Sequence, residues 1–318
     1  MGPHARLFTA RPANSTGEQL LASLFDALWV RYREVVPYVR NYEEIAARYG
    51  APFVNDHIAF RTLGSQRPMT GIPCLGRLFM ALGYQPVACY NFADKHLSAI
   101  HFQHRRADFP KLFVSELKTW ELPAEPRNAL RECAEQHESW AELEQLAELH
   151  ELGSSPPDSV ELRLVTENLC GWFRRPWPAP SLEGVQLVNQ ASQYGAWTML
   201  HGYRVNHFTS LINSHQVPEL DSLEKTMAAL REAGVPTKDS IEGAPGSILR
   251  QSATAAAECE VDVTIAGKPA TTSWTYAYFE LAERGLVTDP TTGQQHRFDG
   301  FLGEQATQLF EMTRSIPN

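Results

Sequence analysis

The segment VNDHIAFRT places a histidine and an arginine four positions apart in a run of strand-forming residues. Alternate side chains of a strand share one face, so we expect His57, Ala59 and Arg61 to point to the same side. Ile58 and Phe60 would then point to the other side, into a core. One face of this strand would therefore present an imidazole, a small side chain and a guanidinium, a combination that could serve a binding site.

Two later segments offer further metal-ligating side chains. His207 lies in VNHFTS, and Glu280 lies in TTSWTYAYFELAER, which is rich in aromatic and β-branched residues typical of a strand. We expect one face of this last strand to carry four side chains, those of Trp274, Tyr276, Tyr278 and Glu280. A carboxylate among aromatic neighbours is unusual, because an isolated buried charge is costly. A bound metal ion would offset that cost.

Together, His57, His207 and Glu280 would form a facial triad, in which two histidines and one carboxylate bind one side of a metal ion. This arrangement leaves open positions for substrate and dioxygen, and Fe(II) oxygenases use it. Simpler interpretations stay open, since a strand histidine is commonly a hydrogen-bonded core residue and a glutamate near a strand end is commonly solvated. Arg61 could clamp a substrate carboxylate with two parallel hydrogen bonds, or it could form a structural ion pair.

Two other pairs of side chains could compete as ligands. His101 and His104 lie three positions apart in IHFQHRR, and Cys133 and His137 lie four positions apart in a helical segment. Neither pair has a matching partner in the other half of the chain, so we interpret both as structural or surface features.

Metal-bound imidazoles need hydrogen-bond partners that orient them. Asn55, Asp56 and Asn206 are adjacent to the two histidines in sequence. Neighbouring strand residues point to opposite faces, so we expect these three to act only through backbone turns.

The segment SILRQSATAA has the small and polar character of a pocket lining, although a turn is an equal alternative. We assign substrate binding to Arg250 and Ser252 of this segment, together with Arg61.

The order of the expected elements indicates an α+β fold with an internal repeat. Each half has a strand with a histidine, then a helix, a glycine and several strands, which predicts paired βαβββ modules at about 51–125 and about 195–290. Such modules form a metal-binding cup of curved mixed sheets. A helical insertion is expected at about 126–152, because Ala, Glu and Leu dominate there. We expect a flexible N-terminal arm at 1–16 and a single catalytic domain at 17–318.

Composition excludes several classes of protein. The chain has 318 residues, 43% of them hydrophobic and 20% charged, which is ordinary for a globular protein. A net charge of −9 argues against nucleic-acid binding. Five widely spaced cysteines without a CxxC pair favour reduced thiols in the cytoplasm. No segment has the length and apolarity of a signal peptide or a membrane span.

Several stretches, spread from about residue 20 to the end of the chain, resemble the 2-oxoadipate dioxygenase/decarboxylase family, also called 2-hydroxyglutarate synthases. The matching stretches are NDHIAFRT (55–62), YNFADKHLSAIHF (90–102), PKLFVSELK (110–118), YGAWTMLHGYRVNHFTSLIN (194–213), IEGAPGSILRQSAT (241–254), YFELAERG (278–285) and DGFLGEQATQLFEMT (299–313).

The resemblance implies a fold related to the vicinal oxygen chelate superfamily and Fe(2+) as cofactor. It implies metal ligands at His57, His207 and Glu280, with Glu283 as a nearby alternative carboxylate, and a substrate-carboxylate arginine at Arg61. The implied reaction, a step of lysine catabolism, converts 2-oxoadipate and dioxygen to 2-hydroxyglutarate and carbon dioxide.

One departure from the family concerns the substrate. The sequence stops soon after FEMT, whereas longer bacterial members have a C-terminal region that also touches the substrate, so a different 2-oxo acid is a further expectation. Two other functions stay open. One is a lyase or isomerase of the same superfamily, with another metal and often a fourth protein ligand. The other is a non-catalytic module that binds a small acid. The oligomeric state cannot be predicted from these patterns.

Overall fold

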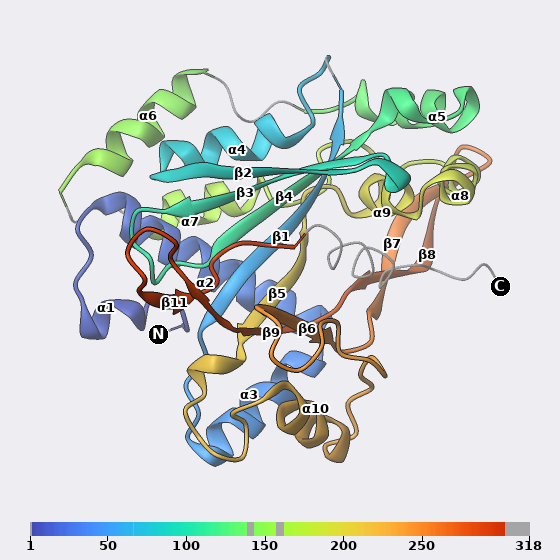
Figure 1. The fold of residues 1–318 in the computed structure, drawn as a ribbon. Helices are drawn as coiled ribbons and strands as arrows, with labels where there is room; N and C mark the ends of the chain where they lie inside the picture. Colours follow the sequence, from blue (N-terminus) through green and yellow to red (C-terminus); the bar gives the residue numbers. More distant parts are fainter. Residues whose placement is uncertain (1, 66, 139–142, 157–161, 303–318) are drawn as a thin grey trace.

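The structure is a computed structural model that describes residues 2–65, 67–138, 143–156 and 162–302 (Figure 1). Its centre is a mixed sheet of seven strands in the order β2-β3-β4-β1-β5-β9-β6. The first half of the chain supplies β1 (Asn55–Gly64), α4 (Ile72–Ala81), β2 (Tyr84–Phe92), β3 (Leu97–His104) and β4 (Lys111–Lys118). The second half supplies β5 (Val205–Leu211), α10 (Leu223–Glu232), β6 (Leu249–Ala253) and β9 (Glu280–Arg284).

The two halves repeat the same pairing. Strand β1 is parallel to β4, and β5 is parallel to β9. Strand β3 is antiparallel to β4, and β6 is antiparallel to β9. The halves join edge to edge through the antiparallel pair β1 and β5. This confirms the predicted α+β class with paired modules, which here form one continuous mixed sheet.

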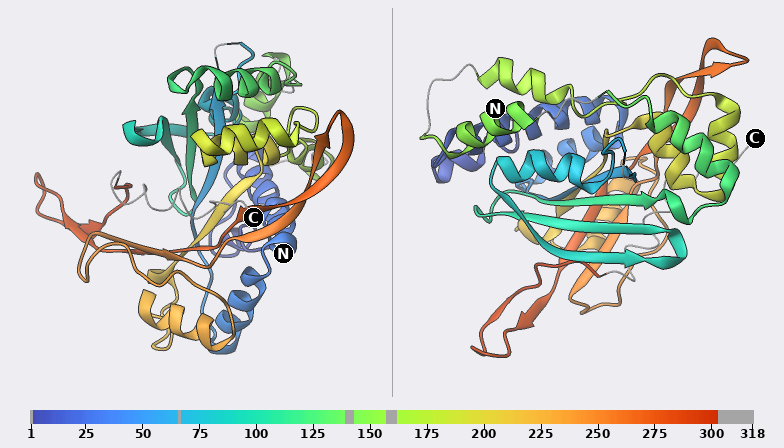
Figure 2. Two further views of the ribbon diagram at one scale, coloured as in Figure 1. Left: turned by 90° about the vertical axis from the view of Figure 1, so that its right-hand side faces the viewer. Right: turned by 90° about the horizontal axis from the view of Figure 1, so that it is seen from above.

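The second module differs from the first between β6 and β9. Here the chain inserts a long hairpin of β7 (Ala257–Ile265) and β8 (Lys268–Ala277), which forms its own two-stranded sheet. A shorter hairpin, β10 (Leu286–Thr288) with β11 (Gln295–Arg297), follows β9. The two hairpins project to opposite sides of the molecule (Figure 2, left).

Because of this insertion, TTSWTYAYFELAER is not one strand as predicted. Strand β8 ends at Ala277, and β9 begins at Glu280 in a different sheet. Tyr276 stacks on Trp197 in the hydrophobic core, whereas Tyr278 lines the same cavity as Glu280. The prediction that Trp274, Tyr276, Tyr278 and Glu280 share one face of a strand is therefore wrong.

One face of the central sheet packs against helices. Helix α2 (Thr16–Val35) passes behind β1 and β5, and α4 lies along β2, β3 and β4 (Figure 1). Ile58 and Phe60 are fully buried on this side, where the Phe60 ring lies 5.6 Å from that of Phe79 on α4. The predicted core face of β1 is thereby confirmed, and the opposite face is left for the site.

The remaining helices flank this core. They are α1 (Leu7–Ala10), α3 (Tyr38–Tyr49), α5 (Ala124–Ala134), α6 (Leu143–Ser154), α7 (Leu162–Cys170), α8 (Leu182–Ala191) and α9 (Gln193–His201), with 3-10 turns η1 (Ala93–Lys95), η2 (Thr119–Glu121) and η3 (Ile212–Ser214). The helical region from α5 to α9 extends well beyond the expected insertion at 126–152. Among the described helices, none combines the length and apolarity that crossing a membrane requires.

Residues 2–16, expected as part of a flexible arm, contact the rest of the domain at several points, although much of this segment is exposed. His4 is only 2% exposed, and its Nδ1 lies 2.9 Å from Asp26 Oδ1 on α2. Arg106 is buried beneath the same segment and donates to the carbonyls of Arg11 and Pro12 at 2.7 and 2.8 Å. These partners lie far away in sequence, so the local composition could not reveal them.

We expect Arg106→Met to destabilise the protein by about 3–5 kcal/mol, because breaking a buried ion pair leaves its partner charge uncompensated. That partner is Glu18, whose Oε2 lies 3.1 Å from Arg106 Nη1. Urea unfolding followed by circular dichroism would measure the loss. An unchanged free energy of unfolding would show that Arg106 does not hold the N-terminal segment in place.

Candidate metal centre

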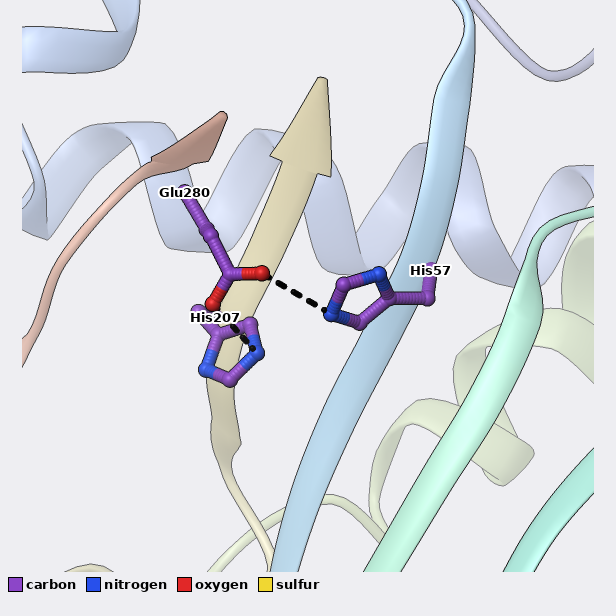
Figure 3. Close-up of side chains that lie close together, drawn as sticks. All are labelled: His57, His207 and Glu280. Atoms are coloured by element: carbon purple, nitrogen blue, oxygen red, sulfur yellow. Dashed lines mark ion pairs between the residues drawn. The ribbon is translucent and has the colours of Figure 1, made fainter. Parts of the chain in front are cut away.

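Three buried side chains on adjacent strands converge on one point of the free sheet face (Figure 3). His57 Nε2 lies 3.2 Å from Glu280 Oε1, and His207 Nε2 lies 3.3 Å from Glu280 Oε2. One ligand atom from each residue lies within 4.8 Å of the others. The three residues are 2%, 8% and 0% exposed, respectively. The structure thus brings together the three ligands expected from the sequence.

Strand register explains this convergence. His57 on β1 is opposite Thr209 on β5, which in turn is opposite Glu280 on β9. The three residues therefore form one row across the sheet. His207 lies two residues before Thr209 and is opposite Ala59, so it shares the face of both His57 and Glu280.

Two β-bulges place a polar partner beside each histidine. The pairing of β1 with β5 skips Asp56 on one strand and Asn206 on the other. His57 Nδ1 donates to Asp56 Oδ2 at 2.8 Å, and His207 Nδ1 donates to Asn206 Oδ1 at 3.0 Å. Both Nε2 atoms then face Glu280, and the Thr209 hydroxyl also lies 3.0 Å from His57 Nε2.

The sequence-based prediction placed Asp56 and Asn206 on the opposite face and was wrong for both side chains. The alternation of strand side chains assumes regular pairing, and a bulge breaks it. Bulges commonly occur next to active sites, where they redirect side chains. Asn55 follows the prediction more closely, since it contacts His4 and the backbone of Thr209.

Burial and charge set the ionisation of the three ligands. Burial raises the pKa of Glu280, but His207 and His57 outweigh it, so the pKa lies below its ordinary value. Burial also lowers the pKa of His57, yet the carboxylates of Glu280 and Asp56 raise it overall. Burial lowers the pKa of His207 to about 3; the Glu280 carboxylate opposes this shift, and His57 and Arg61 add to it. A metal ion would bind the neutral form of both imidazoles.

The donor set fits a divalent transition metal. Glu280 Oε1 accepts a hydrogen bond of 2.7 Å from Gln251 Nε2, whereas Oε2 accepts none from any residue that the structure describes. A buried carboxylate oxygen without such a partner is costly, and a metal ion is one group that satisfies it. Two imidazoles and a carboxylate suit iron and its neighbours. The structure therefore contains a candidate site for a divalent metal ion.

Arg61 lines the same cavity as the three ligands. It is 1% exposed, and its guanidinium lies 4.9 Å from the ring centre of Tyr194 and 5.0 Å from that of Trp197, both on α9. These contacts between a cation and aromatic faces hold the planar group in place. The predicted shared face of His57 and Arg61 is confirmed.

The structure does not place Arg250 and Ser252 at the cavity, which corrects their assignment to substrate binding. Arg250 pairs with Glu224 and Glu283, and Ser252 Oγ donates to the carbonyl of Ser240 at 3.1 Å. Both face away because Gln251 between them faces the ligands. Glu283, the alternative carboxylate, accepts from the Leu223 amide at 3.0 Å and is no ligand.

Gln251 lies in the expected pocket-lining segment but was assigned no role, and several other residues of the site were missed. Gln251, Phe113, Ser115 and Phe301 line the cavity with the ligands. Alternation along β6 could have identified Gln251, once it was known that this segment is a strand. The two competing pairs, His101 with His104 and Cys133 with His137, do not belong to the group of possible metal ligands found among the described residues. His101 Nδ1 bonds the Tyr90 hydroxyl at 2.8 Å.

Comparison with known proteins agrees with this geometry. A model of the family described as 2-oxoadipate dioxygenase/decarboxylase matches residues 25–314. A relative from Oryza sativa subsp. japonica, named 2-oxoadipate dioxygenase/decarboxylase, chloroplastic/amyloplastic, is 25% identical over 301 residues, which are 88% of this chain and 73% of the relative.

Two solved structures share the fold. A glyoxalase superfamily protein of Ralstonia eutropha JMP134 matches with a TM-score of 0.77 and 20% identity, covering 86% of both chains. Hydroxyglutarate synthase of Oryza sativa, solved in complex with 2-oxoadipate, matches with a TM-score of 0.70 and 22% identity, covering 92% of this chain and 91% of that one.

Proposed function

The chain belongs to the 2-oxoadipate dioxygenase/decarboxylase family, and we propose that it is an Fe(II)-dependent enzyme that converts 2-oxoadipate and dioxygen to 2-hydroxyglutarate and carbon dioxide. The observation that carries this proposal is the buried set of His57, His207 and Glu280, with Arg61 in the same cavity. The names of the relatives support the substrate, and the donor set supports iron.

The reaction balances without a further reductant. The bond between the carboxylate carbon and the keto carbon of 2-oxoadipate breaks, and carbon dioxide leaves. One atom of dioxygen enters the new carboxylate at the former keto carbon, and the other becomes the hydroxyl group of the product. Fe(II), when held by His57, His207 and Glu280, would supply open positions for the 2-oxo acid and dioxygen and would take part in the electron transfer.

The protein's own residues bind and orient the reactants. Asp56 and Asn206 fix the two imidazole rings, and Gln251 fixes the Glu280 carboxylate through Oε1. Arg61 holds the carboxylate of the substrate that lies remote from the metal, because a guanidinium matches a carboxylate with two parallel hydrogen bonds. Holding the acid at both ends fixes its pose before the reaction. Phe113 and Tyr278 give the same space aromatic walls.

The repeat argues against a lyase or isomerase site with four protein ligands. Glu280 on β9 is opposite Thr209, two residues after His207. The equivalent position in the first module is opposite Ala59, two residues after His57, and it is Phe113 on β4. An apolar side chain therefore occupies the place where a fourth ligand would lie.

We expect Phe113→Glu to supply that fourth ligand. The variant should release its metal to a chelator more slowly, and its turnover should fall by about 10-fold or more, because a position needed by the reactants is filled. Phe113→Leu is the matched control, since it stays apolar. Faster metal release from Phe113→Glu than from Phe113→Leu would show that position 113 is not equivalent to Glu280.

Anaerobic reconstitution with Fe(II), followed by oxygen-electrode assays with 2-oxo acids of different lengths, tests the function. The proposal predicts oxygen uptake with 2-oxoadipate and less with shorter monocarboxylic acids. Turnover of any substrate without oxygen would favour a lyase or isomerase, and binding without turnover would favour a small-acid binding module.

We propose the cytoplasm as the compartment, because all five cysteines are free thiols.

A further inference from the structure

Residues 298–302, which we call the cover segment, end at the cavity that holds the candidate ligands. Phe301 and Leu302 of this segment line the cavity. The Phe301 ring lies 4.9 Å from that of His57 at an angle of 85°, and 5.0 Å from that of Phe113. The cover segment thus contacts a metal ligand directly.

The cavity is too small for the proposed substrate in this conformation. Its free space measures about 30 Å³, which corresponds to about two water molecules. A six-carbon dicarboxylic acid fills far more than this. Residues that line the cavity must therefore move before such an acid can bind, and Phe301, whose ring packs on those of His57 and Phe113, is among them.

One buried arginine connects the cover segment to the support of His57. Arg284, 3% exposed, donates from Nε and Nη2 to the two oxygens of Asp56 at 2.6 and 2.7 Å. Its Nη1 donates to the carbonyls of Phe298 and Gly300 at 3.1 and 2.8 Å. Asp56 Oδ2 also accepts from His57 Nδ1. The chain of contacts from the cover segment to the ligand is continuous.

An ion pair and two hydrogen bonds of Asp299 hold the outer side of the cover segment. Asp299 Oδ1 lies 2.5 Å from Lys111 Nζ, and Gln103 Nε2 donates to the Asp299 carbonyl and to Oδ2, both at 3.1 Å. Asp299 is 61% exposed at its side chain, so water competes for these contacts. A substitution of Asp299 can therefore weaken these contacts without altering the contacts of Asp56.

We propose that Arg284 is a positioning residue that couples closure of the cover segment to the orientation of His57. When the segment is closed, the carbonyls of Phe298 and Gly300 hold the guanidinium of Arg284 against Asp56. Asp56 in turn holds the ring of His57. When the segment opens to admit the 2-oxo acid, Arg284 loses two acceptors and its hold on Asp56 loosens. This inference rests on the proposed function for the identity of the entering acid. The coupling itself needs only a metal ion.

Coupling between two sites is reciprocal, so metal binding must favour the closed cover segment. Hydrogen exchange of the backbone amides of residues 298–302 should slow when Co(II) is added to the wild-type protein. In Arg284→Lys, which keeps the charge and loses the fork, we expect Co(II) to bind about 10-fold or more weakly. The Co(II)-dependent slowing of exchange should disappear in this variant, and the visible absorption spectrum of bound Co(II) should change.

Arg106→Lys is the matched control, because Arg106 is also a buried arginine that fastens a terminal segment by its backbone carbonyls. It should lose stability without any change in Co(II) affinity or spectrum. If Arg284→Lys does not fold, Asp299→Asn takes its place. It should speed exchange of residues 298–302 and weaken Co(II) binding, with Arg284 intact.

The inference is overturned if the affinity and spectrum in Arg284→Lys or Asp299→Asn match the wild type while exchange of the cover segment changes. It is also overturned if Co(II) leaves exchange of wild-type residues 298–302 unaltered. Failure of the proposed function would be distinct from both results. In that case the coupling would be present with Co(II), but the Fe(II) protein would consume no oxygen with 2-oxo acids.

Discussion

Replacing Glu280 with glutamine is expected to abolish metal retention and to lower turnover by more than the roughly 10–100-fold that loss of a supporting partner costs. Glutamine has the shape of glutamate and can still contact Gln251, but it lacks the charge that faces both histidines at 3.2 and 3.3 Å. Metal content after dialysis and the initial rate of oxygen uptake would measure the two effects.

The matched control is Glu283→Gln, three residues further along β9. Glu283 faces the other side of the strand, where it pairs with Arg250. Its replacement should cost a little stability and leave metal content unchanged. If Glu283→Gln lost the metal and Glu280→Gln retained it, the assignment of the ligands would be wrong.

Replacing Arg61 with lysine is expected to lower kcat/KM for 2-oxoadipate by about 10–100-fold, since a hydrogen-bonded contact to a charged group contributes about 1.5–3 kcal/mol. Lysine keeps the charge but cannot form two parallel hydrogen bonds with a carboxylate or stack between Tyr194 and Trp197. The loss should be smaller for a 2-oxo acid without a second carboxylate, because such an acid gives Arg61 nothing to bind. Steady-state kinetics with both acids would measure this difference.

Arg250→Lys separates this role from a general effect of changing a buried arginine. Arg250 is 6% exposed and pairs with Glu224 and Glu283 away from the cavity. We expect its kcat/KM to match the wild type for both acids. An equal loss for both acids in Arg61→Lys would contradict a role for Arg61 in holding the remote carboxylate.

The grouping of His57, His207 and Glu280 was expected from local signals, although the single aromatic strand assumed for Glu280 does not exist. Each histidine lies in a short run of strand-forming residues, and the repeated order of elements brings two such strands together. Glu280 ends a run of aromatic residues, where an unpaired charge would be costly. The face of β1 that carries His57 and Arg61 follows from simple alternation.

The rest of the site depends on how the strands pair, which the alternation of side chains along one strand does not determine. The bulges at Asp56 and Asn206 exist only in the register between β1 and β5. The assignment of Arg250 and Ser252 failed because alternation fixes two faces without saying which one meets the cavity. The pairing of β6 with β9 determines which face of β6 meets the cavity, since it places Gln251 beside Glu280.

Contacts between segments far apart in the chain could not be predicted from the sequence either. Arg284 and Asp56 are 228 positions apart, and nothing in either neighbourhood indicates the other. The contacts of the N-terminal segment have the same explanation, since the partners of His4 and Arg106 are defined only by the folded chain.

The stoichiometry of the reaction tests the central claim most directly. The Fe(II)-reconstituted protein would be mixed with limiting 2-oxoadipate in air-saturated buffer, and oxygen consumed, carbon dioxide released and 2-hydroxyglutarate formed would be measured together. We expect equimolar amounts of all three, and none of them with Glu280→Gln. Carbon dioxide release without oxygen consumption, or oxygen consumption without 2-hydroxyglutarate, would contradict the proposed reaction.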